Sequence, residues 1–318
     1  MEIGGYFGLE QTIKINNGEY YPSLIALNTA RNALVYIARA RQIKRLYIPF
    51  YLCDSVSGVC DREGIDYSFY HIGKDFLPLF DIALGTDEYL YVVNYYGQLD
   101  NNQLFFLKNK YQRIIVDNVQ AFFQPPLRGV DTIYSCRKWF GVPDGAYLST
   151  NCFLKEELDV DNSDGRTKHL IGRIKDGAFA HYSEFKENDD FFKTLKLMSM
   201  SRFTHELLNN IDYKKIIDSR NDNFSFLHSK LKSINKLSLK AISGPFFYPL
   251  YVDNGEKIRK YLIDNNIYVP ILWPNVINVK ESDYAKNIIP IPCDQRYSKE
   301  EMLFISSLIF SIINSSNE

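Results

Sequence analysis

The sequence predicts an α/β protein whose large domain holds a mainly parallel sheet, followed by a smaller C-terminal α+β lobe. Short apolar or alternating runs recur between residues 24 and 150, and segments with helical spacing separate them. The run at 89–93 is almost entirely apolar, as expected for a strand that is covered on both faces. Repeated alternation of strand and helix implies parallel strands sandwiched by helices.

The first expected helix begins at Asn28 or Thr29, because either side chain can cap a helix N-terminus. Ala33, Leu34 and Ile37 are then spaced to bury one helical face. The expected strands that follow are residues 46–48, 67–70, 89–93, 114–116, 132–134 and 146–148.

Residues 153–200 change in character: many charges come first, then a polar turn at 161–165, and the spacing predicts a helix over 191–200. We interpret this segment as a connector to a second lobe. Beyond residue 205 the expected elements are a helical stretch, a strand at 246–251, a helix at 257–265, a strand at 267–269 and a last helix at 299–313. We therefore predict a large domain over 1–200, connector included, and a small domain over 201–318.

Composition narrows the class of protein. A net charge of −1, with Lys and Arg interspersed among Asp and Glu, argues against nucleic acid as a partner. Five irregularly spaced cysteines indicate reduced thiols, and no Cys/His cluster has the spacing of a metal site. The N-terminus lacks a basic-then-apolar signal, and the chain has no run of about 18 apolar residues. We therefore expect a cytoplasmic protein with no membrane partner and no metal.

Two residues point to a particular chemistry. Asp117 ends the apolar run at 114–116, and Lys138 follows the next expected strand in a turn rich in Gly and Pro. Ligands of parallel sheets bind at the carboxyl ends of strands, where both Asp117 and Ser135 are expected. A carboxylate can keep a pyridine nitrogen protonated, and a lysine amine can bond to an aldehyde. These are the two groups that a pyridoxal phosphate (PLP) enzyme needs.

Six segments in the same order resemble those of the DegT/DnrJ/EryC1/StrS sugar aminotransferases, a branch of the fold-type I PLP enzymes. None is specific alone, but together they cover most of the chain. They are residues 27–34 (LNTARNAL), 47–53 (YIPFYLC), 94–98 (NYYGQ), 116–121 (VDNVQA), 267–274 (IYVPILWP) and 291–297 (IPCDQRY). The resemblance implies a sheet of the seven-stranded type.

The resemblance also implies roles for individual residues. Asp117 would pair with the pyridine nitrogen, and Gln120 would donate a hydrogen bond to the ring oxygen. Lys138 would hold the cofactor covalently and carry the proton during amino transfer. The amine must be neutral to attack, which burial and a nearby cation such as Arg137 favour.

The cofactor phosphate would lie at the start of the first helix, where backbone N–H groups and the helix dipole favour an anion. The residues expected there are Thr29, Ala30, Arg31 and Asn32, with Ser135 as a further candidate. Either Tyr51 or Cys53 would lie against the ring face, and this choice stays open. The chain departs from the common family pattern in its shorter length, in Arg31 and in the tight spacing between Ser135 and Lys138.

The resemblance implies a homodimer with a shared active site that moves the amino group of glutamate onto a keto-sugar. The most natural acceptor is a nucleotide sugar in polysaccharide or glycan biosynthesis. One alternative is a PLP enzyme for a smaller phosphorylated or acyclic ketone. A sugar dehydratase is another, although that branch replaces the lysine by histidine. The third is a catalytically silent regulatory or binding relative, against which the presence of Asp117, Gln120 and Lys138 speaks.

Overall fold

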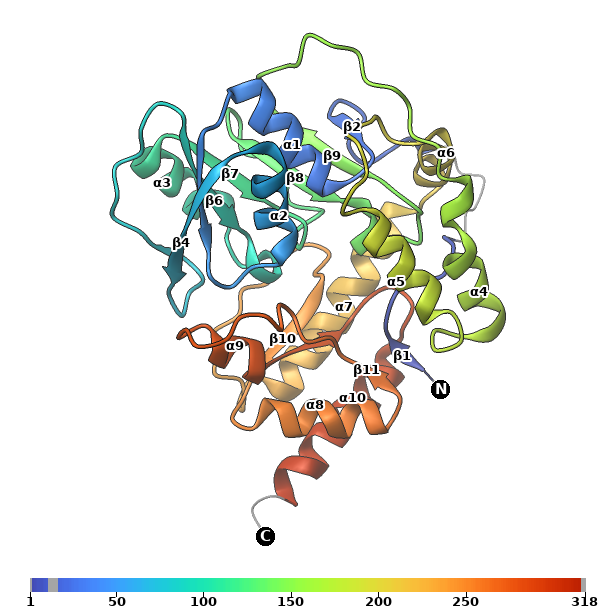
Figure 1. The fold of residues 1–318 in the computed structure, drawn as a ribbon. Coiled ribbons are helices and arrows are strands. Elements are labelled where there is room, and N and C mark those ends of the chain that lie inside the picture. The colour runs from blue at the N-terminus through green and yellow to red at the C-terminus, as the bar shows by residue number, and fades with distance from the viewer. Residues whose placement is uncertain (1, 11–16, 316–318) are drawn as a thin grey trace.

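The computed structural model describes residues 2–10 and 17–315 of the chain. Its main sheet has eight strands in the order β2-β9-β8-β7-β6-β3-β4-β5, and only β9 and β5 run antiparallel to their neighbours (Figure 1). The strands are β2 (Ile25–Leu27), β3 (Arg45–Pro49), β4 (Asp66–Ile72), β5 (Pro78–Leu79), β6 (Glu88–Val93), β7 (Ile114–Asp117), β8 (Asp131–Ser135) and β9 (Ala146–Ser149).

The mainly parallel α/β fold is therefore confirmed, and each of the six strands expected before residue 150 is present. The resemblance implied a sheet of the seven-stranded type, and the observed sheet has eight strands because the two-residue β5 extends its edge. β2 and β5 were not predicted, because three and two residues are too short to show a period of two.

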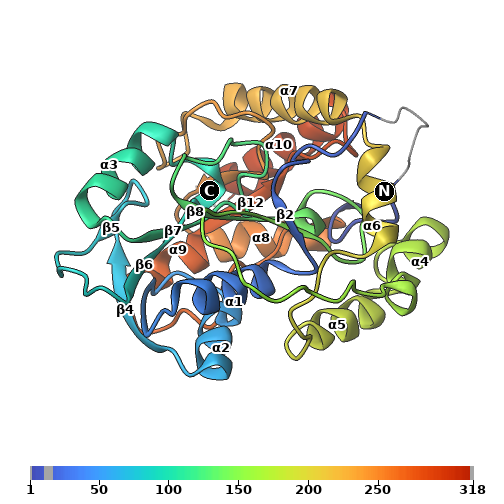
Figure 2. The ribbon, with the colours of Figure 1, turned by 90° about the horizontal axis from the view of Figure 1, so that it is seen from above.

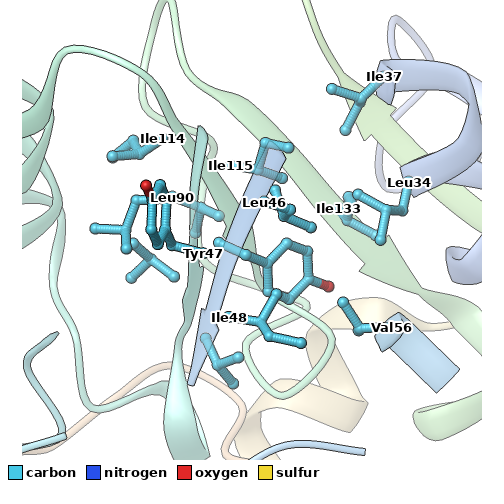
Figure 3. Packing of buried hydrophobic residues seen from close by; sticks show 14 of the residues in the cluster. Leu34, Ile37, Leu46, Tyr47, Ile48, Val56, Leu90, Ile114, Ile115 and Ile133 are labelled. Atoms are coloured by element: carbon cyan, nitrogen blue, oxygen red, sulfur yellow. The ribbon is translucent and has the colours of Figure 1, made fainter. Parts of the chain in front are cut away.

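Helices cover both faces of this sheet. α1 (Ala30–Arg41) and α2 (Asp54–Glu63) lie on one side and α3 (Asn101–Tyr111) on the other (Figure 2). Leu34 and Ile37 of α1 pack into the same apolar cluster as Ile48 of β3 and Ile133 of β8 (Figure 3). Thr29 caps α1, since its hydroxyl oxygen accepts a hydrogen bond from the Asn32 N–H at 3.0 Å. This cap sets the position at which α1 begins beside the sheet.

The C-terminal part has its own small sheets and its own apolar cluster. β10 pairs antiparallel with β12, and β1 near the N-terminus pairs in parallel with β11, so the start of the chain joins its last third. The division into domains at residue 200 stays a prediction. The elements are β1 (Ile3–Gly4), α6 (Arg202–Asn209), α7 (Tyr213–Leu231), β10 (Phe247–Tyr251), α8 (Gly255–Asp264), β11 (Ile267–Tyr268), α9 (Ser282–Asn287), β12 (Ile288–Pro292) and α10 (Lys299–Asn314).

The connector differs from expectation. Its helices are α4 (Lys168–Asp176) and α5 (Tyr182–Phe191), so the predicted helix over 191–200 is wrong. The backbone there is extended instead, because the Met200 N–H donates to the Ala26 carbonyl and the Met198 carbonyl accepts from the Asn28 N–H. Hydrogen bonding to the edge of β2 therefore outweighs the local helical pattern.

No helix in the described part of the chain is long and apolar enough to cross a membrane.

Candidate active site

A cavity opens where β7 and β8 end and α1 begins. Asp117 is the last residue of β7, Ser135 is the last residue of β8, and Lys138 follows in a single 3-10 turn. Eight of the ten expected site residues line this cavity, although they come from four separate segments of the chain. They are Thr29, Ala30, Arg31, Cys53, Asp117, Gln120, Ser135 and Lys138.

Asp117 gives one end of the cavity its negative charge. Its carboxylate accepts hydrogen bonds from the Tyr91 hydroxyl at 2.8 Å and from the Val119 N–H at 2.9 Å. Burial raises the pKa of Asp117, while these two donors and the charge of Lys138 act in the opposite direction. The carboxylate is thus held in one orientation, and a cationic partner in the cavity would favour its charged form.

Gln120 and Lys138 stand beside this carboxylate. The Gln120 carboxamide oxygen accepts a hydrogen bond from the Tyr96 N–H at 2.7 Å, which leaves the NH₂ group as the donor for a ligand. Lys138 is exposed and lines both this cavity and the neighbouring one. Its amine is therefore accessible from two sides.

Two arginines add positive charge to the cavity. Arg31 and Arg137 both face the carboxylate of Asp189 on α5, with closest nitrogen–oxygen distances of 3.6 Å and 3.8 Å. The start of α1 adds the N–H groups and the dipole of a 12-residue helix. Burial lowers the pKa of Arg137 to about 10, which still leaves its guanidinium charged at neutral pH.

Two expected site residues point elsewhere. The Asn32 amide donates to the carbonyl of Lys196 at 2.7 Å and to the Asn28 side chain, so it anchors the connector rather than facing the cavity. Tyr51 is buried in an aromatic group, with its ring 4.4 Å from that of Trp273 and 5.4 Å from that of Tyr95. Of the two candidates for the ring face, Cys53 lines the cavity and Tyr51 does not.

Sequence reasoning missed several lining residues. Arg137 was expected only as a neighbour of Lys138, and Trp273, Phe185 and Asp189 were not expected at all. Trp273 lies within the family-like segment 267–274 and has a φ of 58°, a left-handed conformation that is uncommon for a bulky residue. The resemblance of segment 267–274 to the family was the signal by which Trp273 could have been found. Phe185 and Asp189 lie on the connector helix α5, which no local pattern assigned to the site.

The residues match the chemistry of PLP. A buried carboxylate, two guanidinium groups, a helix N-terminus and a lysine border one cavity. Apolar side chains such as Leu52, Val56 and Val93 also line it. Such a set of groups suits a flat ring with a protonated nitrogen and a phosphate.

The chain matches no protein-family model, and no curated protein sequence matches it. Solved structures do match. A putative sugar aminotransferase from Streptococcus pneumoniae in its PLP form has 15% identity and a TM-score of 0.65, and the match covers 98% of this chain and 93% of that chain. A DegT DnrJ EryC1 StrS aminotransferase from Brucella abortus has 13% identity and a TM-score of 0.62, over 91% and 85% of the two chains.

A third match is S. venezuelae DesV, solved with a ketimine intermediate, with 13% identity and a TM-score of 0.63 over 90% of this chain and 83% of that chain. Such identities are low, but the matches extend over almost the whole chain, main sheet and C-terminal part included. The chain therefore has the fold of the DegT/DnrJ/EryC1/StrS sugar aminotransferases.

Proposed function

We propose that the chain is a PLP-dependent aminotransferase of the DegT/StrS type. It moves an amino group, with glutamate as the donor, onto a keto-sugar that is most naturally nucleotide-linked, in polysaccharide or glycan biosynthesis. The observation that carries the proposal is the convergence of Asp117, Gln120, Lys138, Arg31 and the start of α1 on one cavity. The fold shared with sugar aminotransferases agrees with it.

The chain's residues divide the work by position. Asp117 accepts the ring N–H, and the Tyr91 hydroxyl and the Val119 N–H keep its carboxylate oriented. Arg31, Arg137, Ser135 and the N–H groups at the start of α1 hold the phosphate. When bound, the cofactor supplies an electron-withdrawing ring that makes a neighbouring C–H bond acidic.

Lys138 has two tasks: its amine attaches to the cofactor and also accepts and returns the proton that moves during amino transfer. Arg137 lines the same cavity as Lys138. Lys138 is exposed, so the burial that was expected to favour its neutral amine is not found, and the residue lines two cavities.

The alternatives differ in what they require of Lys138. A sugar dehydratase of this family would carry histidine there, and a silent relative has no chemical need for the Asp117–Lys138 pair. An enzyme for a smaller ketone would use the same cofactor residues and differ only in its acceptor.

We expect a homodimer with a shared site, and a cytoplasmic location agrees with five unpaired cysteines.

The test is the site of cofactor attachment. After borohydride reduction, peptide mass spectrometry should find a pyridoxyl adduct on Lys138 of the wild-type protein and none on the Lys138→Ala variant. Loss of the proton carrier should lower turnover by about 100-fold or more. An adduct on a different lysine, or full turnover in Lys138→Ala, would refute the assignment, and a wild-type protein that binds no PLP would favour the silent relative. Turnover of a small ketone but of no sugar would favour the smaller-ketone enzyme.

A further inference from the structure

A second cavity lies beside Lys138, and we call it the Arg220 cavity. It shares Arg137, Lys138 and Phe185 with the cofactor cavity. Its other walls come from α7, from the start of β10, from the loop after β12 and from the N-terminal segment. A molecule in the Arg220 cavity would therefore reach the Lys138 amine from outside the cofactor cavity.

Arg220 of α7 is a fully buried arginine with an unused donor. Its Nε donates to the Gln295 side chain at 2.7 Å, and its Nη1 donates to the Pro245 carbonyl at 2.9 Å. Its Nη2 is buried without a hydrogen-bond partner among the described residues. The guanidinium lies 4.6 Å from the centre of the Trp139 ring, which holds its plane in place.

The charge of Arg220 is not balanced by a close ion pair. No carboxylate of residues 2–10 or 17–315 is paired with it in a salt bridge. Burial lowers the pKa of Arg220 to about 10, so the group is still charged at neutral pH. A buried cation without a partner is costly, which makes Arg220 a receptor for an anion.

The neighbouring charged groups do not neutralise the positive charge of Arg220. Asp294 is occupied by Arg296, whose Nε and Nη2 donate to its two oxygens at 2.7 Å and 2.9 Å. Glu10 accepts a hydrogen bond from the Gly141 N–H, and burial raises its pKa, which disfavours its charge. Burial lowers the pKa of His169 to about 4, so that ring is neutral at pH 7. Arg220 and Lys138 thus leave the cavity positive.

We propose that the Arg220 cavity binds a carboxylate group of the amino donor, with Nη2 of Arg220 as its principal hydrogen-bond donor. This deepens the proposed function and rests on it. A guanidinium matches the planar carboxylate, and the rings of Phe140 and Phe246 with Val142 provide an apolar lining for the aliphatic part of an amino acid. The Lys138 amine lies 5.8 Å from the centre of the Phe246 ring, so the reacting group borders the same space.

The experiment uses glutarate, a dicarboxylate that has no amino group and so cannot react. Its affinity for the full chain is measured by calorimetry at neutral pH. Arg220→Gln should weaken glutarate binding by about tenfold or more, the size of a lost hydrogen bond to a charged group, and Arg220→Lys should restore part of it. The matched control is Arg259→Gln on α8, a buried arginine that also has an unpartnered nitrogen but lines neither cavity, and it should leave the affinity unchanged.

Three results would overturn the inference: no glutarate binding by the wild type, equal binding by Arg220→Gln, or binding of inorganic phosphate that is tighter than that of glutarate and is lost in Arg220→Gln. The last would assign the cavity to a phosphate-bearing substrate. If both Arg220 variants fail to fold, as judged by circular dichroism, Val142→Met, which enlarges a side chain that lines the same cavity, should weaken glutarate binding to a similar degree. An unchanged affinity in that variant counts against the site. Because glutarate binding is measured independently of the pyridoxyl adduct on Lys138, failure of this inference and failure of the proposed function can be told apart.

Discussion

The burial of the Asp117 carboxylate makes the stability of the folded chain depend on pH. Burial raises its pKa, so between the ordinary and the raised value the folded chain binds more protons than the unfolded chain. Its contribution to stability is therefore fully present below the ordinary pKa and is lost as the pH rises through the folded-state pKa. A buried carboxylate whose pKa is raised by burial is more easily explained by ligand binding than by folding.

We expect Asp117→Asn to separate the effect of Asp117 on folding stability from its role in turnover. The Asn oxygen can keep the Val119 N–H, and the Tyr91 hydroxyl can accept from the new NH₂ group, so the fold should persist. Without cofactor, the variant should be more stable than the wild type at pH 8 by on the order of 1 kcal/mol, and the difference should shrink toward pH 4. Turnover should fall by about 100-fold or more, since an amide cannot hold the ring nitrogen protonated. Thermal melts across this pH range check the first expectation, and a difference that does not vary with pH would contradict it.

Asp189 occupies the cationic end of the cavity. Its carboxylate faces Arg31 and Arg137 and would compete with a phosphate for both. We expect Asp189→Asn to bind PLP a few-fold more tightly, a modest gain because its side chain is 45% exposed and the pairs are long. An absorbance titration measures this, with Asp190→Asn as the control, since Asp190 pairs with Lys193 and does not line the cavity. Weaker binding by Asp189→Asn would instead mean that Asp189 orients the two arginines.

At the scale of elements, the start of α6 is tied to the loop that follows Lys138. The Asp144 carboxylate accepts from the Ser201 N–H at 2.9 Å and from the Ser201 hydroxyl at 2.8 Å, and the Thr204 hydroxyl also donates to it. Ser201 is itself the N-cap of α6. This fully buried carboxylate therefore joins the first helix after the connector to the segment that carries the lysine.

Removing Asp144 should loosen this junction. Asp144→Ala leaves the buried Ser201 N–H and the Thr204 hydroxyl without their acceptor, whereas the Ser201 hydroxyl can still donate to the Thr204 hydroxyl. We expect a loss of about 2–4 kcal/mol in the free energy of unfolding. Asp218→Ala is the control, because Asp218 pairs with Lys214 on the exposed side of α7 and should change stability by less than about 0.5 kcal/mol. Urea unfolding gives both values. Equal losses in the two variants would show that the Asp144 network contributes nothing specific.

At the scale of the whole molecule, several large apolar side chains are exposed on and between α4 and α5. Both helices stand at one side of the molecule (Figure 1). Ile171, Ile174 and Tyr182 are exposed, and the Phe179 side chain between the helices is 83% exposed. Large exposed apolar groups of this kind are typical of protein–protein contacts. A second copy of the chain is the partner that the expected homodimer supplies.

We expect the wild type to sediment as a dimer at micromolar concentration. Phe179→Glu should shift it toward monomer, because a buried carboxylate at the contact would be left without a partner. Glu187→Ala, an exposed change on α5, should leave the dimer intact. A fully active wild-type monomer would rule out a shared site, and a variant that remains dimeric would place the interface elsewhere.

Much of the fold could be read from local patterns. The strands that became β3, β4, β6, β7, β8 and β9 were expected within two residues of their bounds, because apolar runs of this kind are stable only when buried on a sheet. Since parallel strands end at a common edge, Asp117 and Ser135 were expected together, and both do line one cavity. Lys138 was predicted by the same reasoning, three residues beyond the end of β8.

Only the tertiary structure decided how distant segments meet. The backbone at 195–200 is extended because the edge of β2 offers hydrogen-bond partners, and no local period records that edge. Tyr51 is buried beside Tyr95 and Trp273, and Cys53 faces the cavity, although two residues of one strand-end segment cannot be distinguished by spacing. The roles of Arg137, Asp189 and Arg220 depend on contacts with groups far away in the chain. The sequence by itself determined the elements and the residues at strand ends, whereas packing between distant segments decided which side chains face the cavity, because such contacts leave no local pattern.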